Sequence, residues 1–101
     1  MTDRDWIPVL KALADETRLR IVRALLAENL SVNEIAEQLR VSQYNISKHL
    51  RVLREAGIIE VQKKGTRREC ALASAFQKRL AGDKNVLDLG CCSFRFDALP
   101  K

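Results

Sequence analysis

Apolar residues recur at spacings of three and four along the first half of the chain, which is the period of an amphipathic helix. Trp6, Leu10 and Leu13 predict a first helix on this basis. Asp15 is placed to cap a second helix, because a short carboxylate can accept hydrogen bonds from the unpaired amides of a first turn. The predicted inner face of this second helix consists of Leu19, Val22, Leu25 and Leu26. Both helices are expected to pack against one core.

Two further capping signals predict a pair of short helices in close succession. Ser31 and Glu34 form a capping box at the start of a helix over residues 32–39, since each side chain can pair with the other residue's backbone amide. Ser42 supplies the N-cap of the next helix. Only Arg40 and Val41 separate the end of one helix from this cap. The two helices therefore meet across a very short turn.

The helix that follows Ser42 carries its apolar residues on a narrow sector. Ile46, Leu50 and Leu53 share this sector at the helical period and are expected to face the core. The rest of its surface is crowded with amide, hydroxyl, aromatic and cationic groups, namely Gln43, Tyr44, Asn45, Ser47, Lys48 and Arg51. The major groove of DNA admits one helix and displays many hydrogen-bond donors and acceptors. The pattern therefore predicts a helix that reads double-stranded DNA.

Gly57 is placed to end this helix, and the segment IIEVQKKGTRRECAL then predicts two strands joined by a tight turn at Lys64-Gly65. Four cationic side chains crowd the tip of this hairpin: Lys63, Lys64, Arg67 and Arg68. Such a tip suits contact with phosphates or insertion into the minor groove. For an isolated hairpin, the alternative is a solvated edge whose lysines only prevent aggregation. The polar helix before it favours DNA contact.

Composition is consistent with an anionic partner. The chain has 101 residues, 47% of them hydrophobic, which suffices for one globular domain. Eighteen Lys and Arg against 13 Asp and Glu give a formal net charge of +5. No apolar run approaches the roughly 18 residues of a membrane span, and the first residues do not form a signal peptide. Three cysteines do not make a secreted disulfide framework. We therefore expect a cytoplasmic protein with reduced thiols and no membrane partner.

Over roughly residues 9–72, the chain resembles the ArsR/SmtB family of winged helix-turn-helix repressors. The capped helix pair, the VSQ...ISKHLRVLREAGII segment and the Gly-centred basic wing occur in the order and spacing of that family. The resemblance implies a mainly α fold with about five helices and a two-stranded antiparallel wing. Residues 1–82 would form this DNA-binding domain. Residues 83–101 would form a C-terminal extension, with dimerisation or effector binding as its candidate roles.

The resemblance also implies a function. The protein would be a homodimer that binds a palindromic operator in double-stranded DNA and represses transcription until an inducer releases it. By position, the helix contacts would be Ser42, Gln43, Tyr44, Asn45, Ser47, Lys48 and Arg51, and the wing contacts Lys63, Lys64, Thr66, Arg67 and Arg68. Arg18 would have a structural or backbone-contacting role. The alternative is a winged-helix module that contacts proteins without specific DNA readout.

The best-known sensor sites of the family are missing from this sequence. Arsenic and lead sensors place two cysteines on the third helix, where this chain has Ser31 and Asn33. Zinc sensors use Asp and His on a long last helix, whereas no histidine follows His49 here. His49 itself lies at the edge of the apolar sector, which favours a packed or hydrogen-bonding histidine over a metal ligand.

Three cysteines remain as candidate effector ligands. Cys91 and Cys92 are adjacent, and Cys70 lies on the second predicted wing strand. Three thiolates can bind trivalent arsenic, trivalent antimony or another soft metal, and neighbouring thiols can also be oxidised. The structural alternative is that these cysteines are small buried hydrophobes beside Phe94 and Phe96, which alternate with polar residues as in a strand.

The tail contains one misleading motif. VLDLGCC, residues 86–92, resembles the glycine-rich first motif of Rossmann-like methyltransferases. In those enzymes the motif lies at the turn between a parallel strand and a helix. Only about ten residues follow it here, too few for the parallel sheet that such a site requires. We therefore expect that the protein is not an enzyme.

Overall fold

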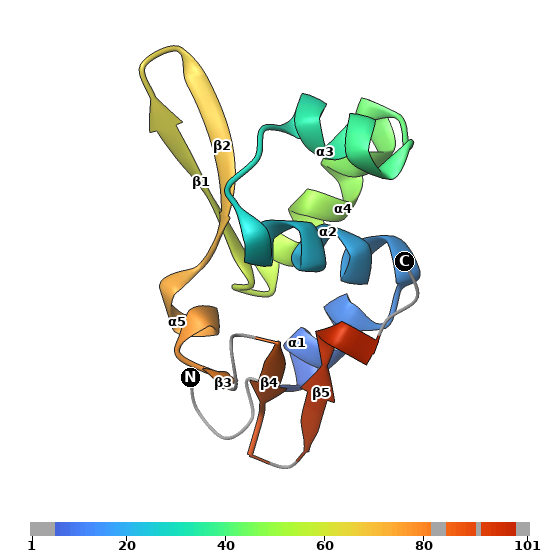
Figure 1. Cartoon of the computed structure of the whole chain (residues 1–101), viewed down its shortest axis with the longest axis vertical. Coiled ribbons are helices and arrows are strands. Elements are labelled where there is room, and N and C mark those ends of the chain that lie inside the picture. Colours follow the sequence, from blue (N-terminus) through green and yellow to red (C-terminus); the bar gives the residue numbers. More distant parts are fainter. Residues whose placement is uncertain (1–5, 82–84, 91, 99–101) are drawn as a thin grey trace.

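The computed structural model describes residues 6–81, 85–90 and 92–98 (Figure 1). Four helices come first: α1 (Trp6–Leu13), α2 (Glu16–Ala27), α3 (Val32–Leu39) and α4 (Gln43–Glu55). The antiparallel hairpin of β1 (Ile59–Lys64) and β2 (Arg67–Leu72) forms the wing. Then follow α5 (Ser74–Gln77), β3 (Leu80–Ala81), β4 (Val86–Asp88), β5 (Ser93–Arg95) and the 3-10 helix η1 (Phe96–Ala98). No helix in these ranges is long and apolar enough to cross a membrane.

The predicted five helices and two-stranded wing are therefore confirmed. Figure 1 shows the wing beside α3 and α4 at one end of the molecule and the strands β3, β4 and β5 at the other end, near α1. α2 lies between these two parts and contacts α1, α3, α4 and β2. The surface that α4 shares with the wing is thus separated from the C-terminal strands.

The central position of α2 changes which of its residues are buried. Val22 and Leu25 are buried as predicted, whereas Leu19 and Leu26 are only half-buried against the core. Ile21, which the predicted inner face omitted, has no exposed surface. The predicted face is therefore confirmed but incomplete, because it left out Ile21. A helix with neighbours on several sides buries a wider sector than a surface helix does.

The three predicted N-caps in the first half of the chain are confirmed. Asp15 Oδ1 accepts from the third amide of α2 at 3.0 Å, and Ser42 Oγ accepts from the third amide of α4 at 3.2 Å. The capping box of α3 is complete, because the Ser31 amide donates to Glu34 Oε1 at 2.9 Å and Ser31 Oγ accepts from the Glu34 amide at 3.2 Å. These caps fix the starts of three helices before any long-range packing is considered.

Gly57 ends α4 in the way the sequence predicts. Its φ angle is +78°, a conformation that favours glycine. The Gly57 amide donates to the Arg54 carbonyl at 3.0 Å, and the Ile58 amide donates to the Leu53 carbonyl at 3.0 Å. These two bonds form a Schellman motif, in which Ile58 and Leu53 are both fully buried. The motif turns the chain from α4 directly into β1.

The turn of the wing lies one residue later than predicted. Lys64 still pairs with Arg67, so the two connecting residues are Gly65 and Thr66 rather than Lys64 and Gly65. Gly65 has φ +65°, and a positive φ at the first connecting residue is what a two-residue hairpin turn requires. The shift keeps both Lys64 and Arg67 within the paired strands, where their side-chain directions are fixed.

The base of the wing is attached to the helical core through backbone hydrogen bonds. The Cys70 amide donates to the Leu30 carbonyl at 2.7 Å, and the Leu30 amide donates to the Cys70 carbonyl at 3.2 Å. Both side chains are buried. Because Leu30 directly precedes the cap of α3, this pairing fixes the wing relative to the helices that follow.

The last described residues, 85–90 and 92–98, contribute to the same core. Leu87 and Phe96 are fully buried and belong to the same hydrophobic cluster as the residues of α1 to α4. β4 lies between β3 and β5 in an antiparallel sheet, and the rings of Phe94 and Phe96 are 5.0 Å apart, edge to face. The VLDLGCC motif therefore begins on an antiparallel strand and not on a parallel one.

The sequence also predicts that Ser74 and Gln77 cap a short helix that ends at Gly82, and the predicted cap is wrong. Ala73 occupies the N-cap position and makes no side-chain hydrogen bond, whereas Ser74 is the first residue of the helix. The Gln77 side chain instead donates to the Leu72 carbonyl at 2.8 Å. A helix of one turn depends on such tertiary contacts more than on its own caps. Gly82, which was expected to end this helix, lies outside the described residues.

Candidate nucleic-acid interface

α4 has the two faces that the sequence predicts. Ile46, Leu50 and Leu53 are buried and hold the helix against the core. We define the readout face as the exposed residues of the N-cap and the first turns of α4 that were predicted to contact DNA: Ser42, Gln43, Tyr44, Asn45, Ser47, Lys48 and Arg51. A helix clamped from behind in this way presents hydrogen-bonding groups on a rigid support.

Tyr44 is the most exposed large hydrophobic residue in the described part of the chain. Its side chain is 62% exposed although no packing within the chain requires an aromatic residue there. Lys48 Nζ lies 4.6 Å from the centre of the ring, a cation–π contact that holds the two side chains together. The pair thus offers one flat apolar surface and one positive charge on the same helix turn.

His49 and Arg18 fix α4 against the first two helices. Arg18 Nη1 lies 3.3 Å from His49 Nδ1, and Arg18 Nε donates to the Ala12 carbonyl. Asp15 lies near both, with Oδ1 3.9 Å from His49 Nδ1 and Oδ2 4.0 Å from Arg18 Nη1. Burial alone would raise the pKa of Asp15. The hydrogen bond from the Arg18 amide and the charges of Arg18 and His49 together outweigh burial, so the pKa lies below its usual value. The predicted packed, hydrogen-bonding histidine is confirmed, and Arg18 has a structural role.

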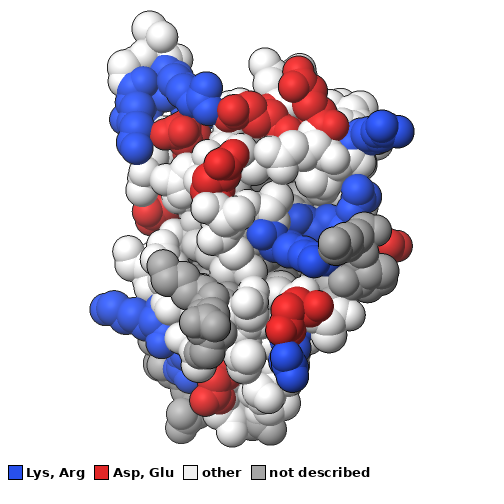
Figure 2. Space-filling model, viewed as in Figure 1, with Lys and Arg blue, Asp and Glu red and all other residues white. Residues whose placement is uncertain are grey.

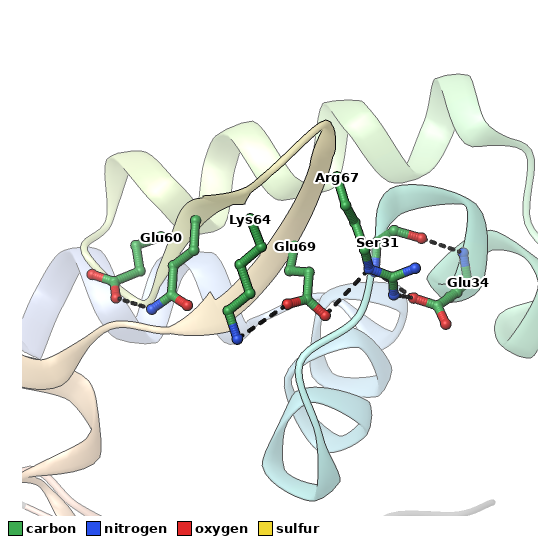
Figure 3. A network of polar contacts seen from close by, with 7 residues as sticks. Ser31, Glu34, Glu60, Lys64, Arg67 and Glu69 are labelled. Carbon is green, nitrogen blue, oxygen red and sulfur yellow. Dashed lines mark hydrogen bonds and ion pairs between the residues drawn. The ribbon is translucent and has the colours of Figure 1, made fainter.

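The cationic wing residues divide into two groups. Figure 2 shows Lys and Arg side chains gathered near the tip of the wing, with acidic side chains next to them. Arg67 pairs with both Glu34 and Glu69, and Lys64 Nζ lies 3.4 Å from Glu69 Oε1 (Figure 3). Within the described residues, Lys63 and Arg68 have no acidic partner. In the free protein, Lys63 and Arg68 are therefore the wing cations most available to a phosphate.

The ion pair of Arg67 joins the wing to the start of α3. Glu34 Oε1 accepts from both the Ser31 amide and Arg67 Nη2 (Figure 3). The hydrogen bond from the Ser31 backbone and the charge of Arg67 hold the pKa of Glu34 below its usual value. The capping box thus has a second function, because it also positions the wing strand that carries Arg67. Glu34 and Glu69 are site residues that sequence reasoning missed.

Arg40 occupies the turn between α3 and α4 in a left-handed conformation, with φ +57°. Its amide donates to the Ala36 carbonyl, and Val41 donates to the same carbonyl at 3.1 Å. Glycine is the usual residue at such a helix end, since a side chain there costs about 1 kcal/mol. In the sequence, the sign of this left-handed residue is that only two residues separate α3 from the N-cap of α4, because so short a connection requires a sharp change in chain direction.

Replacing Arg40 with glycine is expected to raise the free energy of unfolding by about 1 kcal/mol, because it removes the left-handed strain. Arg40→Ala is the matched control, since alanine loses the same charge but keeps the strain. Thermal and urea unfolding of the two variants measure the difference. Equal stability of the two variants would show that the left-handed backbone conformation of Arg40 does not lower the free energy of unfolding.

The cysteines are not equivalent. Cys70, on β2 of the wing, is 2% exposed, and burial raises the pKa of its thiol. Cys92 is exposed, and its carbonyl accepts from the Leu89 amide at 3.0 Å. Cys91 lies outside the described residues. A buried thiol with a raised pKa is a poor source of thiolate, so the structure favours the structural alternative for Cys70.

Comparison with known proteins places this geometry in a family. A sequence profile described as a helix-turn-helix domain matches residues 13–62. The uncharacterised HTH-type transcriptional regulator YceK of Bacillus subtilis is 35% identical over 77 residues, which cover 73% of this chain and 77% of that protein.

Two solved structures have the same fold. HlyU from Vibrio cholerae matches with 37% identity and a TM-score of 0.65, over 69% of this chain and 76% of that chain. Mb0332 from Mycobacterium bovis, a homodimeric winged helix-turn-helix DNA-binding domain of a possible ArsR-family regulator, matches with 30% identity and a TM-score of 0.67, over 70% of this chain and 66% of that chain.

The residues matched by the profile, 13–62, contain α2, α3, α4 with its readout face, and the first part of β1. The chain spans between 45% and 66% of the length of four curated relatives that it matches. These four relatives are 42% to 47% identical to this chain over the matched residues. From its sequence, its fold and these relatives, the chain belongs to the ArsR/SmtB family of winged helix-turn-helix transcriptional regulators.

Proposed function

We propose that this protein binds double-stranded DNA as a homodimer and represses transcription from a palindromic operator. One observation carries the proposal: the readout face of α4 is exposed beside a cationic wing, while three buried aliphatic side chains hold the helix from behind. In this arrangement α4 enters the major groove, and the wing contacts the adjoining phosphates or minor groove. The homodimeric DNA-binding domain among the related structures supports the same assignment.

DNA binding is tested first by selection from a pool of random duplexes. The selected duplex is expected to be a palindrome that binds more tightly than a shuffled duplex of the same composition. Affinity for both should fall steeply between about 50 and 200 mM salt, because bound phosphates release counterions. Failure to enrich any duplex, together with affinity that does not depend on salt, would favour a protein-interaction module.

Two alanine variants should separate base readout from phosphate contact. Gln43→Ala, at the start of α4, is expected to reduce discrimination at one base position by about 1–3 kcal/mol, because an amide can pair with a base edge through two hydrogen bonds. Lys63→Ala, on the wing, should weaken selected and shuffled duplexes alike and reduce the salt slope by about one. Fluorescence anisotropy with both duplexes measures each effect. Equal losses on both duplexes for Gln43→Ala would place the readout helix elsewhere.

The homodimer is tested by sedimentation. The chain has a mass of 11.5 kDa, so sedimentation equilibrium should give twice this mass for a dimer. Ile7 is 38% exposed on α1, where Trp6 and Leu10 are only half-buried, and this apolar surface is the proposed contact between subunits. A monomer at the concentration that saturates the palindrome would contradict the proposal.

The direction of regulation needs its own test, because HlyU of Vibrio cholerae is named a transcriptional activator. A dimer that covers an operator inside a promoter excludes the polymerase, which leads us to propose repression. In-vitro transcription from a promoter that contains the selected duplex should decrease as the protein is added. An increase would refute repression and leave DNA binding intact.

Release by a thiophilic ion or by oxidation stays a prediction. The exposed Cys92 is one candidate ligand, and Cys91 beside it in the sequence is the other. Arsenite, zinc and peroxide are each titrated into the reduced protein on its selected duplex, with the double variant Cys91→Ser and Cys92→Ser as the control. Release of the native protein alone by one agent would establish sensing. Equal behaviour of both proteins would leave these thiols structural.

A further inference from the structure

A cavity of about 310 Å³ lies between α4 and the wing. Three of its lining residues, Leu50, Ile59 and Cys70, are buried and form an apolar floor. Val32 and Val61 add apolar walls, and Val61 keeps 42% of its surface exposed. A volume in this range with mostly apolar walls is typical of a binding site for a small molecule, although near its lower size limit.

Three arginines also line the cavity. Arg51 and Arg54 come from α4, and Arg68 comes from the wing. Arg51 shares its charge with Glu55 at 3.1 Å, whereas Arg54 and Arg68 have no acidic partner within the described residues. No acidic side chain lines the cavity in the described part of the chain. The site is therefore apolar below and positively charged at its edge.

Arg54 is close enough to the floor to affect it. Burial raises the pKa of the Cys70 thiol, and the positive charge of Arg54 acts in the opposite direction. Arg54 and Cys70 both line the cavity. Arg54 was absent from the predicted DNA contacts, because its position near the end of α4 does not mark it in the sequence as part of the readout face.

We propose that this cavity binds a small amphipathic anion, namely a carboxylate with a hydrocarbon body, and that the bound anion prevents DNA from reaching α4 and the wing. The second part rests on the proposed DNA binding. A phosphate backbone needs cationic groups but no apolar floor, whereas a carboxylate with a hydrocarbon tail needs both. Arg51 and Arg68 belong to the predicted DNA contacts as well, so the anion and the DNA would compete for the same charges.

The size of the cavity sets the probe. At about 30 Å³ for each water-sized group, the cavity holds about ten heavy atoms, which is the size of octanoate. The full chain is titrated without DNA by calorimetry, using sodium octanoate, sodium acetate and 1-octanol at constant sodium concentration. Acetate has the charge without the tail, and octanol has the tail without the charge. Octanoate is expected to bind once per chain, at least about tenfold more tightly than either control compound.

Two variants test whether binding occurs in this cavity. Arg54→Gln removes one charge at the edge, and Val61→Thr makes one wall polar at nearly constant volume; each should weaken octanoate binding at least about fivefold. Arg95→Gln is the matched control, because Arg95 is exposed on β5 and pairs with Asp97 at 2.8 Å. Thermal unfolding checks that all three variants fold. The proposed site would be overturned if octanoate did not bind, or if acetate bound as tightly as octanoate. It would also be overturned if both cavity variants bound octanoate as tightly as the native protein.

A DNA measurement tests the competition separately. Saturating octanoate should raise the dissociation constant of the native protein for its selected duplex about tenfold, and should raise that of Val61→Thr much less at the same concentration. Octanoate that binds without changing DNA affinity would overturn the competition. If the chain binds no duplex at all, the proposed function fails, and the calorimetry alone decides whether the cavity binds anions.

Discussion

Replacing Leu53 with alanine is expected to lower the free energy of unfolding by about 3 kcal/mol. Leu53 has no exposed surface and packs α4 against the hydrophobic core. Its carbonyl also accepts from the Ile58 amide at 3.0 Å, in the motif that turns the chain into the wing. Removal of the side chain leaves a void at the point where the readout helix and the wing share their support. Urea unfolding followed by circular dichroism measures the loss.

Val52→Ala is the control for this experiment. Val52 is the neighbouring residue on the same helix but is 39% exposed, so its truncation should change stability by no more than about 0.5 kcal/mol. The folded fraction of Leu53→Ala should keep most of its DNA affinity, because Leu53 faces away from the readout face. A change below about 0.5 kcal/mol for Leu53→Ala would contradict the view that α4 is held by its apolar sector.

Features that depend on a few neighbouring residues were predictable from the sequence. The caps at Asp15, Ser31 and Ser42 need only a short side chain and a free amide three residues later, and all three are present. The buried sector of α4 follows from helical period alone. α3 begins and ends where its capping signal and its apolar spacing place it, at residues 32–39.

Features that depend on contacts between distant segments were not predictable. Glu34 and Arg67 are 33 positions apart, and nothing near either residue shows that they meet. Arg67 was predicted to contact DNA from its place in a basic run, yet in the free protein it pairs with Glu34 and Glu69. A run of like charges in a sequence does not reveal which of them the fold neutralises.

The C-terminal strands show the same limit. The alternation around Phe94 and Phe96 predicted a strand-like segment, and β5 begins at Ser93. Its pairing with β4, and the burial of Leu87 and Phe96 in the main core, require that the chain return to α1 after the wing. Strands of two or three residues carry too little pattern to specify such partners by themselves.

Replacing Lys48 with glutamate is expected to weaken binding to the selected duplex by about 100-fold or more. The substitution removes a cation from the middle of the readout face and puts a carboxylate next to the phosphates, and like charges in contact cost several kcal/mol, at 1.4 kcal/mol for each factor of ten. It also ends the contact of Lys48 Nζ with the Tyr44 ring, which leaves the ring free to turn. Anisotropy at about 150 mM salt measures the loss.

Lys78→Glu separates this local effect from the change in net charge. Lys78 is exposed at the end of α5, so the variant has the same net charge as Lys48→Glu but changes it far from α4. Because charges more than about 8 Å apart are largely screened at this salt concentration, its affinity should fall less than about threefold. Sedimentation should show the same mass for both variants, which excludes an effect on the dimer. Equal losses would mean that the protein attracts DNA only through its overall charge, and the readout face would then have no role in binding.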